Sequence, residues 1–143
     1  MLLSWLPNLF GEIWIPGAVA NELAEGRRKG YEAPDPVDYE WLRVVESENT
    51  PSEWLSLDLG AGEIGAMSLG LENPDKIILL DDLLAREIAK EAGLTVWGTL
   101  RILLEAKSKG LTNAIEPLIG HLCRKGMWLS DNIRRRVLGL AGE

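Results

Sequence analysis

Cysteine is almost absent from this chain, since Cys123 is the only one among 143 residues. No disulfide can form within the chain, and a reducing, cytoplasmic compartment is the simplest expectation. Long apolar runs are also missing, because no stretch approaches the roughly 20 residues that a membrane-spanning helix needs. We therefore expect no association with a membrane.

An excess of basic residues is missing too. The chain has 15 Lys and Arg against 22 Asp and Glu, a formal net charge of −7. This balance argues against binding of nucleic acid through a broad basic face. It leaves open a nuclease whose carboxylates hold metal ions, because bound cations reverse the local field. The length and the 46% of hydrophobic residues are typical of one globular domain, residues 1–143.

Short apolar runs alternate with amphipathic stretches along the chain. Strands are expected at 12–15, 41–45, 77–80 and 94–97, and helices at 2–10, 17–26, 58–71, 83–92, 99–109, 115–126 and 130–140. Asp58, Asp82, Thr99 and Ser130 are the expected N-caps of four of these helices. The alternation implies right-handed parallel crossovers in one sheet. The sequence thus predicts an α/β domain with two helices added at the C-terminus.

Two adjacent carboxylates, Asp81 and Asp82, follow the apolar run 77–80 directly. The carboxyl end of a strand in an open α/β sheet is where ligands bind. Like charges held close together need a cation, a shared proton or open water, and Mg²⁺ is a common partner of clustered carboxylates. A purely structural interpretation is that Asp81 ends the strand and Asp82 only caps the next helix.

Two further acidic residues lie on other predicted elements. Glu22 borders the apolar stripe of helix 17–26, and Glu63 begins the packed face of a glycine-rich helix. Carboxylates that converge from separate elements are what a one- or two-metal phosphodiester hydrolase requires. Arg86 follows Asp82 by one helical turn and is placed to orient a carboxylate or a phosphate, unless it forms only a surface ion pair.

The order of these motifs resembles a family. Ile15-Pro16-x-x-Val19-x-x-Glu22, Leu57-Asp58-x-Gly60-x-Gly62-Glu63, Leu80-Asp81-Asp82-x-x-Ala85-Arg86, Gly98-Thr99-Leu100 and Ala106-Lys107-x-x-Gly110-Leu111 resemble PIN-like proteins related to VapC-type toxins. The resemblance implies a three-layer α/β/α PIN fold that binds Mg²⁺ or Mn²⁺ and cuts RNA, with a small antitoxin protein as partner. It matches Glu22, Glu63 and Asp82 to the catalytic, metal-binding acidic positions of the family. Asp81, the neighbour of Asp82, is a further candidate metal ligand, and Arg86 is the candidate substrate-binding residue.

One departure from the family concerns the first strand. Members begin with a strand that carries an Asp, and this chain starts at Met1 after that point. In the family this strand is the centre of the sheet, so its loss would leave two strand edges unpaired. A misassigned start, a rearranged N-terminal segment and a second copy of the chain remain as explanations, and the last predicts a homodimer.

Two other classes of function remain open besides the nuclease. One is a catalytically inactive PIN-like protein that keeps only a partner-binding surface, which the loss of the first Asp favours. The other is a receiver-like phosphotransfer domain, which requires a Lys after a later strand, where Val96 to Thr99 supplies none.

Three other features have ordinary structural explanations. We expect the six tryptophans to pack in the core or at an interface. Arg134, Arg135 and Arg136 are expected on a solvated face, with RNA phosphate or an acidic partner as alternatives. His121 and Cys123 lie two residues apart on a predicted helix, so their side chains point to different sides. Two ligands of one metal ion would have to point to the same side, so we expect no metal site there.

Overall fold

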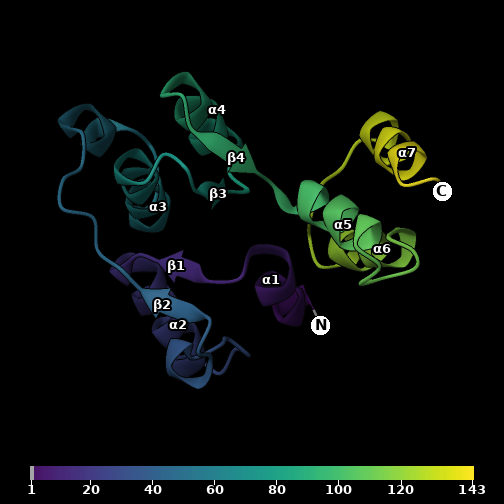
Figure 1. The fold of residues 1–143 in the computed structure, drawn as a ribbon, viewed down its shortest axis with the longest axis horizontal. Helices are drawn as coiled ribbons and strands as arrows, with labels where there is room; N and C mark the ends of the chain where they lie inside the picture. The colour runs from purple at the N-terminus through teal and green to yellow at the C-terminus, as the bar shows by residue number, and fades with distance from the viewer. Residues whose placement is uncertain (1) are drawn as a thin grey trace. The chain divides into compact units, whose positions relative to one another are not determined.

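The computed structural model describes residues 2–143. It consists of two compact units, one formed by Leu6–Trp97 and the other by Gly98–Glu143 together with the first residues of the chain (Figure 1). Helix α1 (Leu2–Phe10) begins in the second unit and ends in the first. In the part of the chain that is described, no helix has both the length and the apolar character needed to cross a membrane.

The unit Leu6–Trp97 contains four short strands in two parallel pairs. Strand β1 (Ile13–Ile15) pairs with β2 (Leu42–Val44), and β3 (Ile77–Leu79) pairs with β4 (Thr95–Trp97). Ile13 lies opposite Leu42, and Ile77 lies opposite Thr95. The predicted α/β class with parallel strands is therefore confirmed. Within residues 2–143 the strands form two sheets of two strands each, where the sequence predicted one continuous sheet.

Three α-helices and two 3₁₀ turns connect these strands. They are α2 (Gly17–Arg28), η1 (Pro36–Asp38), η2 (Ser52–Ser56), α3 (Ala61–Glu72) and α4 (Leu83–Glu91). The prediction that Asp58 caps the glycine-rich helix is wrong, because Gly60 is extended and α3 begins only at Ala61. Asp82 does cap α4 as predicted: its Oδ1 accepts a hydrogen bond from the Ala85 N–H at 2.8 Å.

The glycines of α3 allow this helix to lie directly on the strands. A Cβ placed on Gly70 would lie 3.0 Å from Cγ1 of Ile78 in β3, and one on Gly65 would lie 3.0 Å from Cγ of Pro16, which follows β1. Any larger side chain would push α3 away from both strand pairs. The core beneath α3 and α4 consists of Trp54, Met67, Ile78, Leu80, Ala85, Ala89 and Leu94.

The second unit contains α5 (Thr99–Ser108), α6 (Glu116–Arg124) and α7 (Asp131–Leu140). Its fully buried residues include Leu103, Ala106, Ile115 and Ile119. Ser130 caps α7 as predicted, since its Oγ accepts the Ile133 N–H at 3.2 Å. Thr99 is the first residue of α5 and Gly98 holds the cap position, so the prediction of a Thr99 cap is wrong by one residue.

The last residue, Glu143, joins the helices of this unit. Its carboxylate accepts the N–H groups of Ile115 and Glu116, at 2.9 and 3.1 Å, and the Lys107 Nζ at 2.9 Å. The hydrogen bond from the Ile115 backbone is the largest cause that lowers the pKa of Glu143, and the bond from Lys107 adds to it. The carboxylate thus supplies the start of α6 with a side-chain acceptor that the local sequence lacks.

The tryptophans do not all have the packing role predicted for them. Trp5 and Trp54 are buried, as expected. Trp128, in the loop between α6 and α7, is 83% exposed, so it does not pack in the core of this chain, and packing at an interface stays a prediction for it.

Candidate acidic site

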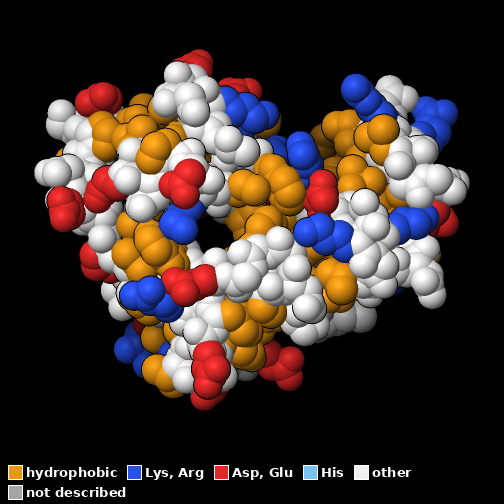
Figure 2. Space-filling model, viewed as in Figure 1, with side chains coloured by type: hydrophobic (Ala, Val, Ile, Leu, Met, Phe, Trp, Pro, Cys, Tyr) orange, Lys and Arg blue, Asp and Glu red, His pale blue; other side chains and the backbone are white. Residues whose placement is uncertain are grey.

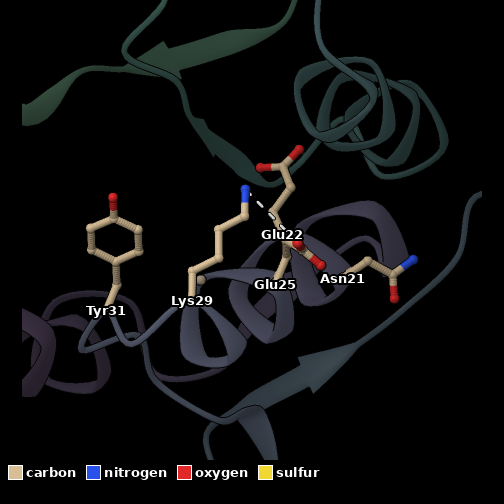
Figure 3. A pocket seen from close by; sticks show the side chains of 6 residues that line it. Asn21, Glu22, Glu25, Lys29 and Tyr31 are labelled. Atoms are coloured by element: carbon tan, nitrogen blue, oxygen red, sulfur yellow. Dashed lines mark ion pairs between the residues drawn. The ribbon is translucent and has the colours of Figure 1, made fainter.

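Glu22 lies where α2 packs against α3. A Cβ placed on Gly62, in the first turn of α3, would lie 3.0 Å from Oε1 of Glu22 and 3.1 Å from Cγ2 of Val19. Gly62 is buried, whereas Glu22 is exposed. Figure 3 shows the Glu22 carboxylate pointing away from the body of α2. Because glycine has no side chain, the Glu22 carboxylate can lie against the start of α3 at Gly62.

Glu63 follows Gly62 in the first turn of α3 and is half-buried. Its carboxylate folds back toward Gly60, where any Cβ would collide with it. A carboxylate in the first helical turn is favoured by the partial positive charge of the helix N-terminus. Glu22 thus meets the first turn of α3 at Gly62, and Glu63 lies in that same turn with its carboxylate directed at Gly60.

Asp81 and Asp82 follow β3, and both side chains are exposed. Asp82 uses Oδ1 to cap α4, so the structural interpretation of this residue is correct as far as the cap is concerned. A cap of this kind leaves the second carboxylate oxygen available for another partner. The two residues thus lie at the carboxyl end of a parallel strand, as the sequence predicted.

Arg86 lies in α4 and is half-buried. Its Nε is buried and has no hydrogen-bond partner within residues 2–143. A buried donor without a partner costs free energy, so this Nε is a polar atom that the described residues leave unsatisfied. The alternative of a surface ion pair finds no partner carboxylate among the described salt bridges.

The described residues contain no group of three or more His, Cys, Asp or Glu side chains close enough to hold one metal ion. The structure therefore places Glu22 and Glu63 near the start of α3, with their carboxylates beside different glycines, and the described residues form no three-carboxylate cluster with Asp81 or Asp82. The donor chemistry still fits a hard divalent cation. Mg²⁺ commonly keeps several waters and takes one or two protein carboxylates together with phosphate oxygens of the substrate.

An open depression of about 510 Å³ runs along α2 beside Glu22 (Figure 3). Its wall is formed by Asn21, Glu22, Glu25, Gly26, Lys29 and Tyr31. Lys29 Nζ lies 3.8 Å from Oε1 of Glu25, so a cation is already present on this wall. Lys29 and Tyr31 were not predicted from the sequence, because both follow the predicted helix 17–26 and its periodicity does not reach them.

Glu46 is another acidic residue that was not predicted from the sequence. It follows β2, and its carboxylate lies over Gly17 so closely that a Cβ there would collide with it. Gly17 is the first residue of α2, so the Glu46 carboxylate faces the N-terminus of that helix, where negative charge is stabilised. The signal was present in the sequence, because Glu46 follows a short apolar strand as Asp81 does.

The arrangement is that of an α/β protein with carboxylates brought to its helix N-termini and strand ends. A family model described as a PIN domain matches residues 1–143. The chain therefore belongs to the PIN-domain family. Neither the comparison with curated proteins nor the comparison with solved structures gives a significant match.

Proposed function

We propose that this PIN domain is a metal-dependent ribonuclease. The observation that carries the proposal is the contact of Glu22 with Gly62, which lies in the first turn of α3, the same turn that carries Glu63. Membership of the PIN-domain family makes a nuclease the class of function to test first. We assign Glu22 and Glu63 to metal binding, with Asp82 as the third acidic residue and Asp81 as a further ligand.

Each residue has a distinct task in this proposal. A bound Mg²⁺ or Mn²⁺ supplies a water of lowered pKa and neutralises charge that develops on the phosphate. Glu22 and Glu63 supply oxygen ligands from α2 and α3, and the absence of a side chain at Gly62 keeps the Glu22 oxygen accessible. Arg86, which is half-buried in α4, would orient a phosphate oxygen with its guanidinium group, a contact that guanidinium groups form well.

The finer identity that we propose is a toxin of the VapC type. Its partners would be an RNA substrate and a small antitoxin protein. Its compartment would be the cytoplasm, where a chain with the single cysteine Cys123 needs no disulfide. A homodimer is part of this proposal, because β1 and β3 each pair on one side only among the described strands.

The test is cleavage of a labelled single-stranded RNA with Mn²⁺ and with EDTA. We expect cleavage only with the metal. Glu22→Gln, Glu63→Gln and Asp82→Asn should each lower the rate at least about 100-fold, the upper end of the cost of mutating a residue that supports a metal ligand. Each change keeps the shape of the side chain and removes its charge.

Glu87→Gln is the matched control, because Glu87 is an exposed carboxylate on α4 with no described hydrogen bond. It should cleave RNA at the wild-type rate. If the three acidic variants cleave as fast as this control, the assignment of the site is wrong. If wild-type protein does not cleave RNA at any Mn²⁺ concentration, the nuclease proposal itself fails.

A partner-binding protein without catalytic activity is the second candidate. The lack of a three-carboxylate group within residues 2–143 favours it. Titration calorimetry with Mn²⁺ separates the two candidates: a ribonuclease should bind the ion and lose that binding in Glu63→Gln, whereas an inactive relative should take up no metal at millimolar concentrations.

A further inference from the structure

The charges of the chain are strongly segregated between the two units. Residues 98–143 contain eight Lys and Arg against four Asp and Glu, whereas residues 6–97 contain seven against eighteen. Figure 2 shows Lys and Arg side chains over α5–α7, and Asp and Glu side chains predominating over α2–α4. The net charge of −7 for the whole chain therefore conceals a cationic unit.

Two arginines of this unit converge on one position of α6. A Cβ placed on Gly120 would lie 3.3 Å from Nη1 of Arg124 and 3.9 Å from Nη2 of Arg134. Neither guanidinium forms a described ion pair with a carboxylate of residues 2–143. Both guanidinium groups therefore lie near the same backbone position, and a bound anion would reduce the repulsion between them.

The neighbouring Arg135 provides a contrast on the same helix. Its guanidinium bonds to Oδ1 of Asn132 at 2.8 Å and to the carbonyl of Asp131 at 3.4 Å. Arg135 is thus held along α7, and Arg134 is the one that reaches α6.

The loop between the two arginines presents Trp128. This indole is 83% exposed, although both ends of the loop are fixed. Met127 donates its N–H to the Leu122 carbonyl at 3.0 Å, and Ser130 caps α7. A large aromatic side chain held in water on an anchored loop is a surface suited to stacking.

We propose that the second unit binds single-stranded RNA, with Arg124 and Arg134 on a phosphate and Trp128 stacked on a base. The proposal rests on the proposed ribonuclease function, since it supplies the surface that holds the substrate. The eighteen acidic residues of 6–97 outnumber its seven basic ones and repel a polyanion at a distance, so long-range attraction to RNA comes from the cationic second unit.

The surface favours RNA over an acidic protein segment. Guanidinium groups match the oxygens of a phosphate with two parallel bonds, and an exposed indole matches the flat face of a base. Every nucleotide of a single strand offers both groups together. An acidic peptide offers carboxylates to the arginines and leaves the indole without a comparable partner.

The test is binding of a fluorescein-labelled twelve-residue oligouridine to the full chain in EDTA, followed by anisotropy. Trp128→Ala should weaken binding about 5- to 140-fold, the range that removal of one stacking side chain gives. Trp128→Phe should retain most of the affinity. The pair Arg124→Ala and Arg134→Ala should lower the slope of log affinity against log salt by about 0.7 for each phosphate that is no longer neutralised.

Arg135→Ala is the matched control, because it removes the same charge from the same helix and leaves Arg134 in place. It should bind oligouridine several-fold more tightly than Arg134→Ala. The proposal is overturned if Arg134→Ala and Arg135→Ala bind equally well, if Trp128→Ala binds as wild type does, or if a polyglutamate peptide of equal charge binds more tightly than oligouridine.

Binding in EDTA is independent of the cleavage reaction. Protein that binds oligouridine through Trp128 but does not cut it with Mn²⁺ would refute the ribonuclease and retain this surface. Protein that cuts RNA with unchanged rate and affinity in Trp128→Ala would refute the surface and retain the ribonuclease.

Discussion

Asp82 combines a structural contact with a proposed chemical one. Its Oδ1 caps α4, and loss of such a cap costs about 0.5–2 kcal/mol. Asn caps a helix as well as Asp does, so Asp82→Asn should keep the stability of the protein while Asp82→Ala lowers it by about 1 kcal/mol. Urea unfolding followed by circular dichroism measures the difference.

The same two variants separate folding from catalysis. Both should lose RNA cleavage, although only Asp82→Ala should be less stable. If Asp82→Asn were as destabilised as Asp82→Ala, its loss of activity could be assigned to the helix and not to the charge.

Glu143 makes the stability of the second unit dependent on pH. Its pKa in the folded protein is lowered below 4.5, first by the Ile115 N–H and then by Lys107. A carboxylate with a lowered folded pKa stabilises the protein above its unfolded pKa, and this contribution is lost as the pH falls through the folded pKa. Glu143→Gln should therefore lower the Tm at pH 7, and the difference from wild type should shrink below pH 4.5.

Glu105→Gln is the control for this measurement, because Glu105 lies on α5 with no described side-chain bond. It should change the Tm at pH 7 less than Glu143→Gln does. An equal change in the two variants would mean that the contacts of Glu143 with Ile115 and Lys107 do not stabilise the folded state.

At the scale of single elements, the glycines of α3 and α7 behave differently. Gly70 lies against Ile78, so Gly70→Ala should destabilise the protein by about 1–3 kcal/mol through overpacking. Gly139 in α7 has nothing within 4 Å of a new Cβ, so Gly139→Ala should stabilise the helix by up to about 1 kcal/mol. Thermal unfolding of both variants tests the sign, and a stabilised Gly70→Ala would contradict the close packing of α3 on β3.

The elements could be predicted from sequence where the signal is local. A cap such as Asp82 or Ser130 contacts an N–H three residues away, so its side chain and its target lie in one short stretch. Asp58 has the same residue type, but Leu59 and Gly60 continue the extended chain and α3 starts later. The division of the strands into two pairs depends on contacts between residues far apart in sequence. The hydrophobic periodicity of each segment does not predict such contacts.

The candidate site was predictable only in part for the same reason. Acidic residues that follow a strand, such as Asp82, or lie in a first helical turn, such as Glu63, can be identified from the sequence. The contact of Glu22 with Gly62 spans forty residues and depends on how α2 packs on α3. The contact by which Glu143 caps α6 likewise joins residues twenty-eight positions apart. Trp128 lies in a loop, where the sequence has no hydrophobic periodicity from which its exposure could be predicted.

At the scale of the whole molecule, the two strand pairs lead to a prediction about assembly. Lys76, just before β3, places its Nζ 4.3 Å from the centroid of the Trp14 ring in β1, so side chains of the two pairs meet at this point. An unpaired strand edge exposes donors and acceptors that another chain can satisfy. We expect light scattering at micromolar concentration to give about twice the monomer mass of 15.8 kDa.

Trp14→Lys would place a second cation beside Lys76 at this edge. It should shift the population toward the monomer, whereas Tyr31→Lys, a change of an exposed residue outside both strand pairs, should leave the mass unchanged. A wild-type protein that remains monomeric at high concentration would contradict the assembly.

The segregated charge of α5–α7 also has a consequence at the bench. A sequence pI near 4.8 predicts that the protein adheres to anion-exchange resin and flows through a cation exchanger. Heparin is a polysulfated matrix that binds local basic patches of a protein whatever its net charge. The arginines around Gly120 should therefore retard this acidic protein on a heparin column. Elution by a salt gradient from both the anion exchanger and heparin would show that this acidic protein carries a separate basic surface.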